Sequence, residues 1–145
     1  NAAIRVSLAP LAAAGSPPMQ LALTTLVVAD YDEAIAWFCG ALGFVLRADE
    51  PRGEGKRWVV VGPAVGGAGL LLARAASEAQ QARVGDQTGG RVAFFAHTRD
   101  FHGDYQRMRA FGVEFVEAPR HEDYGWVVVF RDLCGNRWDL LEQRA

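Results

Sequence analysis

The sequence has few cysteines, no marked excess of either charge and no long apolar run, and each absence excludes a class of function. Its two cysteines, Cys39 and Cys134, stand in neither a C-x-x-C nor a zinc-type spacing, so we expect two free thiols in a reducing, cytoplasmic compartment. Fifteen basic against 17 acidic residues give a formal charge of −2 without a basic stripe, which argues against a nucleic-acid partner. No apolar stretch approaches the length of a membrane-spanning helix, so no membrane partner is expected either.

Two common catalytic or nucleotide-binding motifs are also missing. The stretch Gly66-Gly67-Ala68-Gly69 is rich in glycine, but it lacks the Lys-Ser/Thr pair of a phosphate loop and opens no helix, so it is interpreted as a turn. No G-x-S-x-G elbow or other nucleophile motif is present. The sequence therefore indicates neither a nucleotide-binding loop nor a covalent nucleophile.

Residues 1–18 differ in composition from the rest of the chain. The sequence begins with Asn rather than Met, and its alanine- and leucine-rich start is interrupted by Pro10, which argues against a secretory signal. Ser16-Pro17-Pro18 is typical of a linker. We expect 1–18 to be an N-terminal extension, or a tag and linker, and 19–145 to form one domain.

One sequence pattern occurs twice. Residues 30–44 (DYDEAIAWFCGALGF) and 100–113 (DFHGDYQRMRAFGV) each follow a β-like run, open with Asp, carry an apolar helical stripe and stop at Gly. Two copies of one supersecondary unit nearly fill the chain. We expect module one at 19–74, a joining segment at 75–90 and module two at 91–145.

Each module is predicted to have the order βαβββ. The expected strands are 21–29, 44–48, 57–61 and 70–73 in module one and 91–98, 113–117, 124–131 and 137–142 in module two, with a short helix near 77–82 in the joining segment. Because a helix covers only one face of a sheet, the other face stays free. The fold class is α+β, with two mixed sheets forming a cup, helices on the outer face and a ligand in the hollow.

Five segments in order carry a resemblance to a known family. They are 23–30 (LTTLVVAD), 41–44 (ALGF), 92–100 (VAFFAHTRD), 111–115 (FGVEF) and 130–142 (FRDLCGNRWDLLE), the last being the most specific. In these the chain resembles the vicinal-oxygen-chelate superfamily, which includes glyoxalase I, the bleomycin-resistance proteins and the extradiol dioxygenases. The resemblance covers residues 19–142. It implies the cup-shaped fold and a homodimer, with ligand clefts shared by two chains in the bleomycin-resistance group.

The resemblance also implies where a metal would be held. Members with a divalent metal place ligands on the first, fourth, fifth and eighth strands, which correspond here to Leu23, to the leucines at 70–72, to Arg91 and to Asp139. Leucine has no donor atom, and arginine is a permanent cation that repels a divalent metal. We therefore expect no metal and no other cofactor.

Arg91 and Asp139 are expected to face each other, because the resemblance places the fifth strand beside the eighth. Two interpretations stay open: a structural ion pair, or a ligand-facing pair in which Arg91 binds a carboxylate, phosphate or enolate. Strand alternation over 91, 93, 95 and 97 would put Phe95 and His97 on the same face as Arg91. Arg91, His97 and Asp139 are the candidate catalytic residues.

Aromatic side chains supply the expected apolar walls. Trp58 and Trp126 occupy equivalent places in the two modules, where they either hold a flat apolar ligand or pack in the core or a dimer seam, whereas Trp37 and Trp138 are expected in the core. Tyr124 is a candidate hydroxyl donor at the mouth of the cup. The complete expected lining comprises Leu23, Thr25, Trp58, Arg91, Phe95, His97, Tyr124, Arg137 and Asp139.

Three functions are compatible with this sequence. The first is metal-independent binding of a small, partly apolar molecule, such as sequestration of an antibiotic or metabolite. The second is a divalent-metal lyase, isomerase or dioxygenase acting on vicinal oxygens, which needs metal ligands from other positions. The third is a metal-free enzyme in which Arg91 stabilises an enolate and His97 or Asp139 acts as base.

Overall fold

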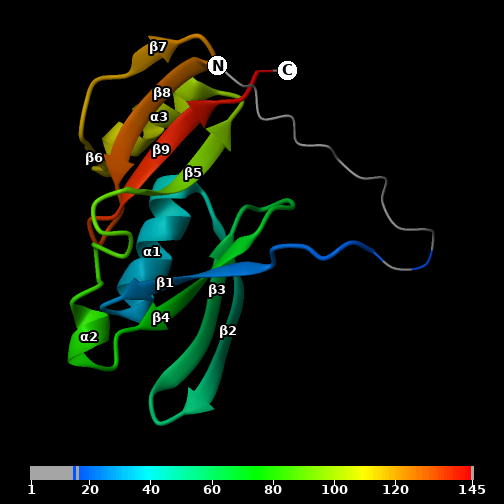
Figure 1. The fold of residues 1–145 in the computed structure, drawn as a ribbon, viewed down its shortest axis with the longest axis vertical. Helices are drawn as coiled ribbons and strands as arrows, with labels where there is room; N and C mark the ends of the chain where they lie inside the picture. Colours follow the sequence, from blue (N-terminus) through cyan, green and yellow to red (C-terminus); the bar gives the residue numbers. More distant parts are fainter. Residues whose placement is uncertain (1–14, 16, 145) are drawn as a thin grey trace, which may run out of the picture.

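The computed structural model describes residues 15 and 17–144 and contains two sheets (Figure 1). Most of the predicted N-terminal extension, 1–18, lies outside the described residues. No helix in the described part of the chain is long and apolar enough to cross a membrane. The α+β prediction with two βαβββ modules is confirmed.

Module one forms a four-stranded sheet with one helix. Its elements are β1 (Leu23–Val28), α1 (Tyr31–Leu42), β2 (Val45–Gly53), β3 (Lys56–Gly62) and β4 (Gly69–Arg74). The strand order is β1-β4-β3-β2, with β1 parallel to β4 and the other pairs antiparallel. Strand β2 runs five residues past the predicted end at 48, because the chain reverses only at Glu54 and Gly55, both with positive φ.

Module two repeats the plan with one added strand. Its elements are β5 (Val92–Thr98), α3 (Phe101–Phe111), β6 (Glu114–Phe115), β7 (Arg120–Glu122), β8 (Gly125–Arg131) and β9 (Arg137–Glu142). The order is β5-β9-β8-β6, and β7, which the sequence analysis missed, also pairs with β8. Between the modules lies the predicted short helix, α2 (Glu78–Gln81).

The ends of the two long helices follow the sequence. The carboxylate of Asp30 accepts a hydrogen bond from the Glu33 amide at 2.8 Å, and that of Asp100 accepts one from Gly103 at 3.2 Å. Gly43 and Gly112 end the helices in the left-handed region, at φ 68° and 103°. These caps fix where each chain segment leaves its helix and enters the next strand.

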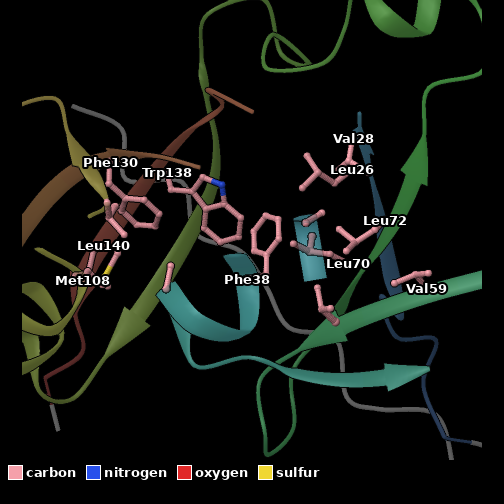
Figure 2. Close-up of a cluster of buried hydrophobic side chains, with 14 of the residues drawn as sticks. Leu26, Val28, Phe38, Val59, Leu70, Leu72, Met108, Phe130, Trp138 and Leu140 are labelled. Carbon is pink, nitrogen blue, oxygen red and sulfur yellow. The ribbon is translucent and has the colours of Figure 1, made fainter. Parts of the chain in front are cut away.

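One hydrophobic core joins the modules. Phe38 of α1 is buried, and its ring lies 5.9 Å from that of Trp138 on β9. Figure 2 shows Phe38 between the apolar side chains of module one and those of module two. Helices α1 and α3 also contact each other, for example where the Arg107 side chain donates to the Ala41 carbonyl at 2.8 Å. Within residues 17–144 the modules therefore meet through their helix layers, and no strand of one sheet pairs with a strand of the other.

Candidate functional site

The register of the second sheet brings several predicted site residues onto one face. Phe95 of β5 lies opposite Asp139 of β9, and His97 lies opposite Leu141. On the other side of β9, Val129 of β8 is paired with Asp139. Residues directly opposite each other point to the same side of a sheet, and the alternate residues of these strands are in the core. We call the side with Phe95, His97, Arg137 and Asp139 the open face of the second sheet.

The first sheet has a corresponding helix-free face. Leu23 pairs with Gly69 and Thr25 with Leu71, and neither Leu23 nor Thr25 belongs to the core cluster. Trp58 alternates with the buried core residues Val59 and Val61, so it also lies on the helix-free side. Its side chain is 36% exposed, and the Arg52 guanidinium lies 5.7 Å from the ring centroid.

The predicted ion pair between Arg91 and Asp139 is wrong. Strand β5 begins at Val92, and a register shift between Val92 and Phe94 breaks the alternation assumed from 91 to 97. Asp139 is consequently opposite Phe95, four positions beyond Arg91. Its buried Oδ1 atom has no hydrogen-bond partner in the part of the chain that the structure describes.

The environment of Asp139 favours its neutral form. Burial raises the pKa of this carboxyl group, the Arg120 guanidinium acts in the opposite direction, and Glu117 adds to the rise. A protonated carboxyl group can donate a hydrogen bond as well as accept one. Asp139 thus offers an orienting polar group on an otherwise largely apolar face.

The aromatic residues divide between the open face and the helix side. Phe95 is 64% exposed on the open face, and Tyr124 is 56% exposed just before β8. The expectation that Trp126 forms a ligand wall is wrong. Trp126 shares its side of β8 with core residues and packs between the rings of His102 and His121, each 5.0 Å away.

A cleft of about 760 Å³ lies between the modules. Phe95 and His97 line it from β5, Leu70 lines it from β4, and part of the glycine-rich 63–68 loop forms its rim. We call this the inter-module cleft. It is of the size that holds a drug-sized ligand, and it adjoins the open face at Phe95 and His97.

Arg47, which the sequence analysis missed, shapes the rim of this cleft. Its guanidinium donates to the carbonyl oxygens of Pro63, Gly66 and Gly67 at 2.7, 2.6 and 3.1 Å. A side chain at Gly62 would overlap this guanidinium, so glycine is required there for steric reasons. The sequence did contain a signal for this contact: an arginine on an edge strand near a glycine-rich loop. Such loops present free carbonyl groups that an arginine can bind.

The four metal-ligand positions implied by the family resemblance do not fit a metal. They hold Leu23, the leucines at 70–72, Arg91 and Asp139, of which only Asp139 carries a donor that a divalent ion accepts. Among the described residues, no group of three or more His, Cys, Asp or Glu side chains is placed to hold a metal ion.

Arg91 and Arg137 lie in a second, smaller hollow. It has a volume of about 190 Å³ and is also lined by Arg131. None of its lining residues borders the inter-module cleft. The nine residues predicted to line one cup therefore contribute to two separate hollows and two helix-free sheet faces.

Comparison with known proteins gives one family and one fold. The model of the Glyoxalase/Bleomycin resistance protein/Dioxygenase superfamily matches residues 20–140. An uncharacterized protein of Shewanella frigidimarina (strain NCIMB 400) is 51% identical over 119 residues, which are 81% of this chain and 88% of the relative. The crystal structure of UcmS2 has a TM-score of 0.76 at 29% identity and covers 86% of this chain and 98% of its own.

A further solved structure shares this fold. TnmS3, described as an antibiotic binding protein from Streptomyces sp. CB03234, has a TM-score of 0.71 at 24% identity. The match covers 90% of this chain and 100% of TnmS3.

Proposed function

Because this chain belongs to the glyoxalase/bleomycin resistance protein/dioxygenase superfamily, we propose that it is a metal-independent binding protein for a small, partly apolar molecule. The observation that carries the proposal is the exposed ring of Phe95, which borders the inter-module cleft and lies opposite the unpartnered carboxyl group of Asp139. A large exposed aromatic group beside a cleft is typical of a ligand surface.

Apolar contact would supply most of the affinity. The Phe95 ring can stack against a flat ligand, and the exposed side chains of Leu21 and Val65 add apolar surface to the same cleft. Burying such surface is favourable at roughly 25 cal/mol per Å². A planar ligand of several fused or linked rings therefore fits this surface better than a small polar metabolite.

Polar groups would set the orientation of the ligand. Asp139 with its raised pKa presents a hydrogen-bonding group on the open face, and His97 lies two residues from Phe95 on the same side of β5. A hydroxyl or N–H group on the ligand would donate to the Oδ1 atom that lacks a partner. We expect this contact to discriminate between ligands of similar apolar area.

A homodimer is part of the proposal. The helices bury a core shared by the two modules, which leaves the other face of each sheet without a cover in one chain. Exposed apolar side chains on such faces are stabilised when another surface covers them. A second copy would enclose the ligand, and Trp58 would then contribute an aromatic wall from the first sheet.

The proposed ligand class is supported by proteins of the same fold. TnmS3 is described as an antibiotic binding protein, and the family name includes bleomycin resistance. We infer sequestration of an aromatic antibiotic as the specific role. Among the described residues no cluster of metal ligands favours the metal-dependent lyase, isomerase or dioxygenase. The enolate mechanism needs Arg91 near His97 or Asp139, but Arg91 and His97 line different hollows and Asp139 lies opposite Phe95.

Calorimetric titration of metal-free bleomycin and a panel of polycyclic aromatic antibiotics tests the proposal. At least one compound should bind equally well before and after treatment of the protein with a chelator. Phe95→Ala should weaken that binding by roughly tenfold, because stacking and buried area are lost. Val116→Ala, which shortens an exposed apolar side chain after β6, is the control and should bind like the wild type. Unchanged binding by Phe95→Ala would contradict the proposed surface.

A further inference from the structure

Three arginines, two on adjacent strands and one just before a third strand, line the small hollow of about 190 Å³. Arg131 of β8 and Arg137 of β9 are directly opposite each other, so their side chains emerge on the same side of the sheet. Arg91 precedes Val92, the residue of β5 that pairs with Arg137. The hollow is therefore lined by arginines at the ends of β8 and β9 and by the arginine just before β5.

This arrangement is electrostatically unfavourable without a counter-charge. Like charges directly opposite each other destabilise a pair of strands. Among the described residues, the only ion pair involving these arginines joins Arg131 to the largely exposed carboxylate of Glu114, at 3.7 Å. Asp86 is the only acidic residue in the lining. Three arginines and one aspartate thus line the hollow.

The walls of the hollow are fixed by other contacts. The Gln87 amide donates to the side-chain oxygen of Asn136 at 3.2 Å, which ties the joining segment to the turn between β8 and β9. Arg131 itself donates to the Gly135 carbonyl at 3.3 Å. Gly85 packs so closely against the Cys134 carbonyl that a side chain there would overlap it. A rigid wall reduces the entropy lost when a ligand is held.

Size and chemistry restrict the occupant. A volume of about 190 Å³ is below the range of pockets for drug-sized ligands, which begins near roughly 300 Å³. Guanidinium groups donate paired hydrogen bonds that match the oxygens of phosphate and carboxylate groups. Three such groups provide more donors than a single carboxylate can accept, whereas a tetrahedral dianion has oxygens for all three.

We propose that Arg91, Arg131 and Arg137 form a binding site for a phosphate group, separate from the aromatic ligand surface. The group is either inorganic phosphate or the terminal phosphate of a small phosphomonoester. The site is distinct from the inter-module cleft, because no described residue lines both, and it borders the open face through Arg137.

Phosphorus NMR titration and calorimetry with inorganic phosphate test this site, with acetate and glycerol 3-phosphate as comparison ligands at matched ionic strength. Phosphate should bind with one-to-one stoichiometry. Arg137→Gln should weaken binding at least about tenfold, because a charge-assisted contact is lost. Arg99→Gln, an equal change of charge at an exposed position outside the hollow, should bind within roughly twofold of the wild type. Tighter glycerol 3-phosphate binding would assign the site to phosphomonoesters, and equal or weaker binding to inorganic phosphate.

A second measurement, the melting temperature, tests the protein in the absence of phosphate. In low-salt, phosphate-free buffer, Arg137→Gln should raise the melting temperature, because repulsion with Arg131 is relieved. Phe95→Ala should leave phosphate binding unchanged, which separates failure of this site from failure of the aromatic surface. The proposal is overturned by absent phosphate binding, by tighter binding of acetate, by equal losses in Arg99→Gln and Arg137→Gln, or by an unchanged or lowered melting temperature.

Discussion

The buried carboxylate of Asp132 organises the turn between β8 and β9. It accepts hydrogen bonds at 3.0 Å from the backbone amides of Cys134, Gly135 and Asn136, and another at 3.0 Å from the indole N–H of Trp138. Trp138 in turn packs on Phe38 and is 3% exposed. Residues 130–142, the segment that resembles the family most specifically, therefore contain residues that the fold itself requires. This explains why the segment indicated the fold clearly but said little about the ligand.

Asp139 gives a stability prediction that depends on pH. Burial raises the pKa of this carboxyl group, so its contribution to stability is fully present below its ordinary pKa and is lost as the pH rises through the raised value. Asp139→Asn keeps the size and removes the charge. We expect the variant to equal the wild type at acidic pH and to be more stable by on the order of 1 kcal/mol at neutral pH.

Urea denaturation at both pH values measures this difference. The matched control is Asp123→Asn, at an exposed position between β7 and β8, and it should change stability little at either pH. A lower stability of Asp139→Asn at neutral pH would mean that the Asp139 carboxylate has a favourable partner after all.

Individual residues differed in how far the sequence revealed them. Asp30 and Asp100 were identifiable as helix caps, because capping depends on neighbours three residues away. The lack of a partner for Asp139 was not identifiable from the sequence, because it depends on which residue of β5 lies opposite Asp139. Arg91 precedes β5 and lies four positions before the residue opposite Asp139, and the strand register that sets this separation leaves no local mark in a sequence.

The joining segment acts as a structural element without being a strand. The Gln87 side chain accepts from the Val27 amide at 2.9 Å and donates to the Thr25 carbonyl at 2.6 Å. It thereby covers part of the free edge of β1, where unpaired backbone groups would otherwise invite association with another strand. Sequence reasoning placed this segment between the modules, but it gave no indication that one glutamine closes the edge.

Gly85 should be the most sensitive position of this segment. Its φ of 81° favours glycine, and a side chain would also overlap the Cys134 carbonyl. Gly85→Ala should destabilise the fold by about 3 kcal/mol, of which roughly 1 kcal/mol reflects the backbone conformation and the remainder the displaced turn.

Gly89→Ala is the matched control for this change. Gly89 has a comparable φ of 66° but no atom within 4 Å of an added side chain, so only the smaller, conformational part should appear. Thermal and urea denaturation of both variants give the two values. Equal losses of stability in the two variants would show that the close packing of Gly85 on the turn does not contribute to stability.

At the scale of the whole molecule, the internal repeat predicted the two modules but not how they meet. Each module needs its helix to cover one sheet face, which the apolar stripes indicated. The contact between α1 and α3, and the ring of Phe38 against Trp138, depend on packing between distant segments. The consequence is a chain with one shared core and helix-free sheet faces.

Those faces predict the assembly of the protein. Phe95 and Trp58 remain 64% and 36% exposed, so we expect a homodimer with twice the chain mass of 15.7 kDa. Phe95→Glu places a charge on the open face and should raise the dimer dissociation constant by roughly tenfold or more. Val116→Glu adds the same charge at an exposed position beyond β6 and should leave the dimer intact. Sedimentation velocity over a dilution series measures all three proteins. A monomeric wild type, or equal weakening by both glutamates, would mean that the open face is covered by something other than a second copy.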